Sequence, residues 1–156
     1  MVIVRLCASG DLVDVADLLS GDKHCRMASA LRSCRALVWD ATTFKRLTDR
    51  FPTLRLNLLR IFTAHLAELE GRFREMATER VSLRVARQFL RLADKIGQAI
   101  VDICLSREEL AQMTGTTLFT VSRLVSSWEG RGIVQTRRGG VTICDFPTLH
   151  AVAEEA

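Results

Sequence analysis

The chain has 156 residues, a length that suits one compact domain or two small ones. Hydrophobic residues make up 48% of it and charged residues 26%, so the chain can bury a core, which argues against intrinsic disorder. The net charge of +4 favours an anionic partner only mildly, but the basic residues are 19 Arg against 3 Lys. Arginine binds phosphates and guanine edges in a bidentate manner, although a GC-rich genome also enriches arginine.

The first 40 residues predict short strands. Residues 2–13 (VIVRLCASGDLV) have the β-branched content of a strand and run into a turn, and residues 20–25 predict a second turn. Residues 36–40 (ALVWD) predict another strand. These pieces alone cannot bury both faces of a sheet, and a barrel needs closure. We therefore expect this region to be the end of a larger β structure.

From Phe51 and Pro52 onward the hydrophobic pattern changes to helical spacing. Apolar residues recur every three or four positions over about six turns, and charged residues lie off that face. We call this pattern the apolar stripe; it consists of Leu54, Leu58, Phe62, Leu66, Leu69, Phe73 and Met76. Such a helix either packs on its own domain or pairs with a partner helix, and we predict a homodimer. The predicted interface residues are Leu58, Phe62, Leu66, Leu69, Phe73 and Met76.

Two elements follow the apolar stripe. Around residues 78–82 the stripe loses register, which suggests a hinge. A second helix continues through Val81, Val85 and Phe89 and ends near Gly97. Residues 99–105 (AIVDICL) then predict a short strand.

Residues 106–144 hold the most specific pattern of the chain. Ser106 and Glu109 form a capping box at the start of a short helix, and Gly115 supplies the tight turn after it. Thr116 or Thr117 then caps a second helix. That helix runs to about Glu129, and the core between the two helices would consist of Leu110, Val121 and Leu124.

Two strands joined by a basic, glycine-rich turn follow (IVQT, RRGG and VTIC), so the pattern predicts a winged helix. The second helix of such a unit enters the major groove with its N-terminal residues toward base edges. Arg123 can bind guanine, and Arg137 and Arg138 on the wing would meet phosphates, whereas the alternative for Arg123 alone is a solvated helix charge. The predicted DNA-binding residues are Thr116, Thr117, Leu118, Thr120, Ser122, Arg123, Arg137 and Arg138.

Four segments resemble the Crp/Fnr family of bacterial transcription regulators. Residues 105–134 (LSREELAQMTGTTLFTVSRLVSSWEGRGIV) resemble its helix-turn-helix closely, and residues 79–93 (ERVSLRVARQFLRLA) resemble the segment after its dimer helix. Residues 10–19 (GDLVDVADLL) and 29–47 (SALRSCRALVWDATTFKRL) look like the last part of its sensory barrel.

The resemblance implies an α+β fold in three parts. Residues 1–50 would be the remnant of an effector-binding jelly roll, a partial β-barrel. Residues 51–78 would be a dimerisation helix, and residues 79–156 a C-terminal winged helix-turn-helix domain that binds DNA. A jelly roll has about eight strands and Met1 falls within one, so we expect a mis-assigned start or a truncation.

Two further departures from the family concern ligands. Where its cyclic-nucleotide sensors have Gly-Glu, this chain has Asp14 and Val15, and a carboxylate there would repel a phosphate, so cyclic nucleotide binding is not expected. Many members have Glu on the recognition helix where this chain has Phe119, preceded by Leu118. Phe119 either contacts a thymine methyl group or packs inward, so the operator sequence cannot be carried over.

The resemblance implies a sequence-specific transcription regulator that acts as a homodimer on a palindromic promoter site. Its partners would be double-stranded DNA and RNA polymerase. The alternative is a truncated subunit that dimerises with a full-length regulator and titrates it. The intact winged-helix pattern separates the two, because an interaction fragment would not need Arg123 or the wing.

Enzymatic and extracellular functions find no support in the sequence. The histidines His24, His65 and His150 are far apart without metal-ligand spacing, so we expect no enzyme activity, metal or cofactor. The cysteines Cys7, Cys25, Cys34, Cys104 and Cys144 are odd in number and scattered, so they indicate neither a structural zinc site nor a secreted disulfide framework. Cys25 and Cys34 are either a redox pair or buried, unreactive thiols. No signal peptide is recognisable, and no apolar run approaches the roughly 20 residues of a membrane span, so we expect a cytoplasmic protein without membrane contact.

Overall fold

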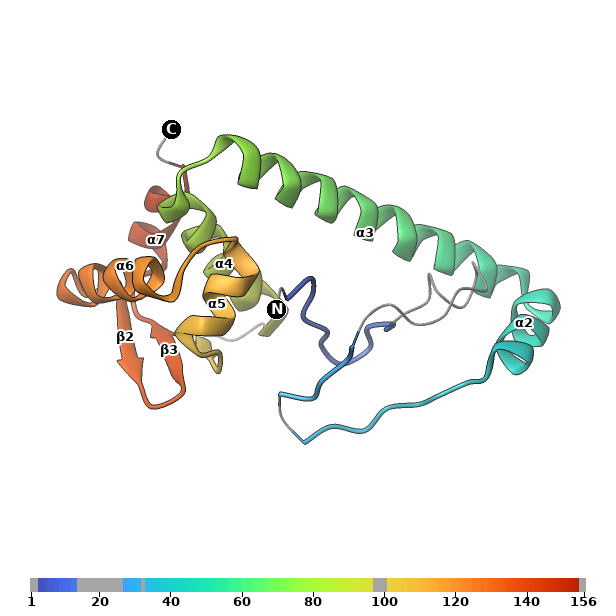
Figure 1. The fold of residues 1–156 in the computed structure, drawn as a ribbon. Helices are drawn as coiled ribbons and strands as arrows, with labels where there is room; N and C mark the ends of the chain where they lie inside the picture. The colour runs from blue at the N-terminus through green and yellow to red at the C-terminus, as the bar shows by residue number, and fades with distance from the viewer. Residues whose placement is uncertain (1–2, 14–26, 32, 97–100, 155–156) are drawn as a thin grey trace. The chain divides into compact units, whose positions relative to one another are not determined.

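Figure 1 shows the computed structural model of the chain, which describes residues 3–13, 27–31, 33–96 and 101–154. The chain forms two compact units, Cys7–Glu70 and Met1–Leu6 with Gly71–Ala156. The long helix α3 (Pro52–Thr78) contributes to both units. Within these described ranges, no helix has both the length and the apolar character that crossing a membrane requires.

The first unit contains the helix α2 (Ala41–Arg50), which begins after Asp40. The carboxylate of Asp40 accepts hydrogen bonds from the backbone N–H and the hydroxyl of Thr43, both at 2.8 Å. These hydrogen bonds lower the pKa of Asp40 below its ordinary value of 3.8. Arg55 of α3 donates to the carbonyl of Thr48 at 3.3 Å, so the C-terminal turn of α2 is joined to the first turn of α3.

The two strands predicted in the first 40 residues are not formed. Residues 3–13 and 36–40 contain no strand, and residues 33–40 are exposed. The prediction was wrong because β propensity expresses packing on a pleated surface, and the described residues nearby offer no neighbouring strand for pairing. The predicted turn at 20–25 and Cys25 lie outside the described residues, so neither that turn nor the Cys25–Cys34 pair is tested, although Cys34 itself is an exposed free thiol.

The helix predicted from the apolar stripe is confirmed as α3, which is continuous over 27 residues. It ends at the predicted hinge, and α4 (Val81–Ile96) follows after two residues outside both helices. The end of α4 at Ile96 agrees with the prediction of a helix end near Gly97. Sequence periodicity therefore located both helices to within a turn.

The second unit contains a small antiparallel sheet of three strands: β1 (Val101–Ile103), β2 (Val134–Arg137) and β3 (Gly140–Ile143). The strand order is β1-β3-β2, so β3 lies in the middle and pairs with both neighbours. Its residue Val141 is opposite Ile103 of β1, and both side chains are buried. The strand predicted at 99–105 and the predicted hairpin are thus parts of one sheet.

Three helices pack with α4 and this sheet: α5 (Arg107–Thr114), α6 (Leu118–Gly130) and α7 (Phe146–Glu154). The rings of Phe89 from α4 and Trp128 from α6 meet edge to face, with centroids 6.0 Å apart. Of the predicted core residues, Leu110 and Val121 are fully buried, and Leu124 is half-buried against the core. Among the described residues, the large side chains that are fully buried are Val85, Phe89, Ile103, Leu110, Val121, Val125, Ile133, Val134, Val141 and Leu149.

The helix α7 was not among the elements predicted from the sequence. Asp145 caps it by accepting hydrogen bonds from the backbone N–H of Thr148 at 3.0 Å and from its hydroxyl at 2.6 Å. The hydroxyl and then the N–H of Thr148 lower the pKa of Asp145. Leu149 and Val152 bury the inner face of α7 in the core that it shares with α4. The signal was present, because an Asp cap precedes apolar residues at helical spacing.

Candidate nucleic-acid interface

The start and end of α5 are set by hydrogen bonds within the chain segment itself. Glu109 N donates to Ser106 Oγ at 3.1 Å, and Ser106 N donates to Glu109 Oε2 at 2.7 Å, which confirms the predicted capping box. The helix ends at Gly115, whose φ of 62° lies in the left-handed region that favours glycine. Thr116 N then donates to the carbonyl of Ala111 at 3.0 Å, which closes the turn.

The cap of α6 is Thr117 rather than Thr116. Its hydroxyl accepts a hydrogen bond from Thr120 N at 3.2 Å and lies 3.0 Å from the hydroxyl of Thr120. Thr117 therefore caps the helix, and one of the two threonine O–H groups is used in the bond between the hydroxyls. Both residues belong to the predicted DNA-binding set, and their first role is to define where α6 begins.

One side of α6 faces the core and the other carries the predicted binding residues. Val121, Val125 and Trp128 are buried on the inner side. Arg123 is exposed on the other side, whereas Ser122 is half-buried. Leu118 and Phe119 are 50% and 75% exposed at the first turn. The structure therefore brings Leu118, Ser122 and Arg123 onto one face of α6, together with Phe119 from outside the predicted set.

The wing is the hairpin of β2 and β3 with the turn Arg138–Gly139 between them (Figure 1). Gly139 has a φ of 78°, and the side chains of Arg137 and Arg138 are exposed. Arg137 donates to Cys104 Sγ at 3.3 Å, so its guanidinium lies beside the end of β1. Of the two predicted wing cations, Arg138 is at the tip and Arg137 lies against the sheet.

Glu129 joins the last turn of α6 to the wing. One of its carboxylate oxygens accepts hydrogen bonds from Thr136 N at 2.7 Å and from the Thr136 hydroxyl at 2.6 Å. The hydroxyl and then the N–H of Thr136 lower the pKa of Glu129 below its ordinary value. The helix α6 and the β2–β3 hairpin are therefore joined by a side-chain contact as well as by the core that they share.

Two arginines bind the C-terminal end of α5. Arg72 donates to the carbonyl of Met113 at 2.9 Å, and Arg84 donates to the carbonyls of Thr114 at 3.2 Å and Gly115 at 3.4 Å. The last carbonyls of a helix have no partner within that helix, so the guanidiniums supply donors where they are missing. The turn between α5 and α6 is thereby attached to the end of α3 and to α4.

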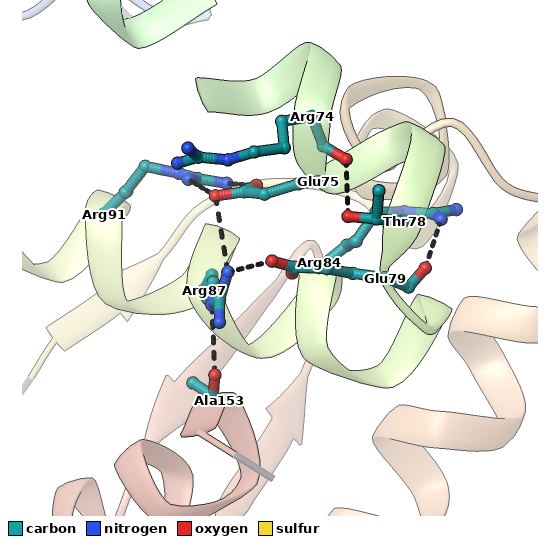
Figure 2. Close-up of polar contacts among 8 residues, drawn as sticks. All are labelled: Arg74, Glu75, Thr78, Glu79, Arg84, Arg87, Arg91 and Ala153. Atoms are coloured by element: carbon teal, nitrogen blue, oxygen red, sulfur yellow. Dashed lines mark hydrogen bonds and ion pairs between the residues drawn. The ribbon is translucent and has the colours of Figure 1, made fainter. Parts of the chain in front are cut away.

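A cluster of ion pairs holds the end of α3 to α4, as Figure 2 shows. Arg91 binds Glu75 with two hydrogen bonds of 2.8 Å each. Arg87 lies 3.9 Å from Glu75, is hydrogen-bonded to Glu79, and donates to the carbonyl of Ala153 in α7 at 3.0 Å. We call Glu75, Glu79, Arg87 and Arg91 the junction cluster.

The charge of Glu75 is stabilised within the junction cluster. Burial by itself raises the pKa of Glu75, but the hydrogen bond and charge of Arg91, with the charges of Arg87 and Arg72, outweigh burial and lower it. Glu75 therefore remains ionised and connects α3 to α4 by charge.

The apolar stripe on α3 is largely uncovered within the single chain. Leu66, Leu69, Phe73 and Met76 are between 41% and 76% exposed. Leu58 is buried, and Phe62 is half-buried. The C-terminal part of the predicted interface is therefore available to a partner, whereas Leu58 already packs within its own chain.

Several residues that shape this region were not predicted from the sequence. Arg72 and Arg84 were assigned no role, and no local pattern marks them, because they bind carbonyls 41 and 30 residues away along the chain. Glu129 could have been found, because it is an acidic residue at the end of α6 before a strand with a hydroxyl residue. The sequence left open whether Phe119 packs inward, and its 75% exposure shows that it does not.

Comparison with known proteins finds regulators of transcription. Residues 83–152 match the family of Crp-like helix-turn-helix domains, and this range contains α5, α6 and the whole sheet. The chain is similar to the transcriptional regulatory protein btr of Bordetella pertussis, with 26% identity over 145 residues, 90% of this chain and 60% of that protein. It is also similar to the CRP-like cAMP-activated global transcriptional regulator of Mycobacterium tuberculosis, with 26% identity over 152 residues, 94% of this chain and 68% of that one.

A solved structure supports the same relationship. The chain is similar to a transcriptional regulator of the CRP/FNR family from Thermus thermophilus, with a TM-score of 0.61 and 25% identity. The similarity covers 67% of this chain and 56% of the Thermus chain. Against the Bordetella protein too, the chain spans only about 60% of the relative's length.

Proposed function

We propose that the chain is a transcription regulator of the Crp/Fnr family and that it binds DNA sequence-specifically as a homodimer on a palindromic promoter site. The match to Crp-like helix-turn-helix domains and the similarity to regulators of this family support the proposal. The single observation that carries the proposal is the outer face of α6. It is the second helix of a helix-turn-helix, its inner face is fully buried, and its first two turns expose side chains that no core contact requires. A helix of this kind fits the major groove with its N-terminal residues toward the bases.

Arg123 is the residue to which we assign base recognition. It is exposed on the second turn of α6, on the same face as Leu118 and Ser122. A guanidinium in that place can donate two hydrogen bonds to O6 and N7 of guanine. Thr116, Thr117, Thr120 and Ser122 are suited to phosphates, because their hydroxyls lie in the turn before α6 and in its first two turns.

The wing supplies the sequence-independent part of binding. Arg138 lies at the tip of the hairpin and Arg137 one residue before it, both exposed. Cations on a protruding turn attract phosphates without contacting base edges, which strengthens binding to any duplex and makes it dependent on salt.

Dimerisation would be provided by the exposed part of the apolar stripe. Four large apolar side chains on one helix face are uncovered in the single chain. Pairing with the same face of a second copy would remove them from water, and this burial is the main driving force of helix association. A two-fold dimer carries one α6 per chain, which is why the proposed site is palindromic.

The remaining parts of the proposal rest on the family. Residues 1–50 would be the end of a sensory barrel, α3 the dimer helix, and residues 79–156 the DNA-binding domain. The regulator would act in the cytoplasm and contact RNA polymerase at the promoter. The Mycobacterium relative is named as cAMP-activated, but we expect no response to a cyclic nucleotide here, because Asp14 stands where the family's sensors have Gly-Glu.

The alternative function is that of a subunit that pairs with a longer relative and titrates it. The exposed apolar stripe favours this alternative as much as it favours a homodimer. The outer face of α6 favours DNA binding, because a titrating subunit needs no recognition residue there.

The test is selection of bound sites from random duplex DNA, followed by binding measurements with variants. We expect a two-fold symmetric consensus, and we expect Arg123→Ala to lose preference for it. Arg46→Ala, which removes the same charge from α2, is the matched control and should keep the preference. Recovery of no consensus, with no binding to any duplex, would instead favour the titrating subunit.

A further inference from the structure

Two apolar residues in the first turn of α6, Leu118 and Phe119, are exposed to solvent. Phe119 is 75% exposed and Leu118 is 50% exposed. Single exposed apolar residues are ordinary on protein surfaces, but an exposed aromatic residue beside an exposed leucine at one helix end is a small apolar surface. The core beneath them is complete without them, since Val121, Val125 and Trp128 close it. Phe119 therefore does not pack inward.

The surroundings of this apolar pair restrict what it can contact. Phe119 and Arg123 are four residues apart on α6, so their side chains are neighbours on one face, one turn apart. The hydroxyls of Thr117 and Thr120 are bonded to one another, and the ring of Phe119 remains 75% exposed beside them. The apolar ring of Phe119 suits a methyl group of a ligand, and the neighbouring cation of Arg123 suits a ligand with negative potential. A ligand that fits both presents a methyl group within a negatively charged groove.

The major groove of DNA offers one apolar group on its base edges, the C5-methyl of thymine. We propose that Phe119, supported by Leu118, is a specificity-determining residue that contacts thymine methyl groups in the operator. This inference rests on the proposed function, because it requires α6 to lie in the major groove. A phenyl ring cannot accept a hydrogen bond from cytosine, so a thymine is selected at the base pair that faces residue 119.

Deoxyuridine provides a direct probe, because it keeps the charge and hydrogen bonds of thymidine and removes only the methyl group. In a duplex obtained by site selection, each thymine is replaced singly by deoxyuridine. We expect one or two positions in each half-site at which the wild-type affinity falls about fourfold, the effect of one methyl group removed from its contact. The other thymines should show no change.

Variants assign the methyl contact to Phe119. Phe119→Ala should bind the thymine and deoxyuridine duplexes equally at the sensitive positions, whereas Phe119→Met should retain part of the difference. Arg123→Ala is the matched control on the same face: it should weaken binding yet keep the full sensitivity to deoxyuridine. Because Phe119 is mostly exposed, its variants should unfold at the wild-type temperature, and this is checked alongside.

The outcomes separate this inference from the function on which it rests. If the chain binds no duplex, the proposed function fails. If it binds a selected site but no deoxyuridine lowers the affinity, or if the loss persists in Phe119→Ala, DNA binding stands and the role of Phe119 is overturned. A further pair of duplexes carries cytosine or 5-methylcytosine at the position of the required thymine. The duplex with 5-methylcytosine should bind more tightly than the one with cytosine, because it regains the methyl group that Phe119 contacts.

Discussion

Arg123 and the wing arginines are all exposed cations, but their positions give them different roles. Arg123 projects from a regular helix whose ends and inner face are fixed, so its reach is defined. Arg138 projects from a turn that contains a glycine with positive φ, and Arg137 adjoins it. A defined position suits a base edge, whereas a protruding turn suits the repeated charge of the backbone.

We predict that Arg123→Ala lowers affinity for the selected site by about 1–3 kcal/mol and relaxes the preference at one base pair. Removing both Arg137 and Arg138 should weaken selected and scrambled duplexes alike, and lower the slope of log K against log salt by about one unit per lost phosphate contact. Salt titrations on both duplexes measure these effects. An equal loss on both duplexes for Arg123→Ala would make that residue a phosphate contact.

Gly140 lies where the strands β1 and β3 come close together. A Cβ added to Gly140 would lie 2.6 Å from the carbonyl oxygen of Ile103 in the paired strand β1, too close for any real contact. We expect Gly140→Ala to destabilise the second unit by about 1–3 kcal/mol, because backbone must shift. Gly71→Ala is the matched control: nothing lies within 4 Å of its added Cβ, and alanine should stabilise α3 by about 0.5–1 kcal/mol.

Thermal unfolding of the two glycine variants measures the difference. The melting temperature should fall for Gly140→Ala and rise for Gly71→Ala. Equal shifts would mean that the close approach of β1 and β3 at Gly140 is not tight.

Ion pairs and hydrogen bonds join α3, α4 and α5 in addition to the apolar core that α4 and α5 share. The junction cluster holds α3 to α4, and Arg72 and Arg84 hold the carbonyl end of α5. Removal of one partner of a partly buried, hydrogen-bonded ion pair lowers the stability of the fold, because the other charge is left without compensation. The α5–α6 turn is therefore held by the guanidiniums of Arg72 and Arg84, and the carboxylate of Glu75 holds α3 to α4 beside it.

Glu75→Gln tests this arrangement. The folded-state pKa of Glu75 lies below its ordinary value of 4.5. Its ionisation therefore adds stability that is fully present above pH 4.5 and is lost as pH falls through the lower folded value. We predict that Glu75→Gln is less stable than wild type at neutral pH, and that the gap closes as pH falls below 4.5.

The measurement is the unfolding midpoint as a function of pH for both proteins. Glu70→Gln makes the same chemical change at an exposed position of α3 and should alter the midpoint little at neutral pH. A gap between wild type and Glu75→Gln that stayed constant from pH 7 to pH 3 would contradict a role for the charge.

For the molecule as a whole, the exposed part of the apolar stripe is the feature that indicates a partner. We predict that Leu66→Asp combined with Leu69→Asp yields a monomer, because carboxylates at a buried helix interface cost several kcal/mol. Light scattering measures the mass. Leu56→Asp is the matched control: it is a comparably exposed leucine of α3 about 120° around the helix from the stripe, and it should leave the dimer intact. A dimer that survives the double change would have its interface elsewhere.

A homodimer also predicts the form of the operator. Two copies of α6 related by two-fold symmetry should protect two half-sites about one helical turn apart, or about 34–36 Å. Footprinting on a selected site should show this symmetry, and the Leu66 and Leu69 double variant should lose it. Protection of one unsymmetrical half-site by the wild type would be inconsistent with a dimer.

The sequence by itself determined the elements whose hydrogen bonds are local. The capping box of Ser106 and Glu109 and the positive φ of Gly115 each involve residues within one turn, so the limits of α5 and the start of α6 could be predicted closely. The spacing of the apolar stripe likewise predicted α3, because helical period is a property of one segment. The same helical period predicted which side of α6 faces solvent and which side faces the core.

Only the tertiary structure decided the features that depend on distant parts of the chain. Arg72 and Arg84 bind carbonyls 41 and 30 residues away, and no spacing in the sequence records such contacts. The strands expected in the first 40 residues failed for the same reason, because a strand exists only when another segment pairs with it. Whether Phe119 packs inward or points to solvent also depended on the core, which Val121, Val125 and Trp128 fill without it.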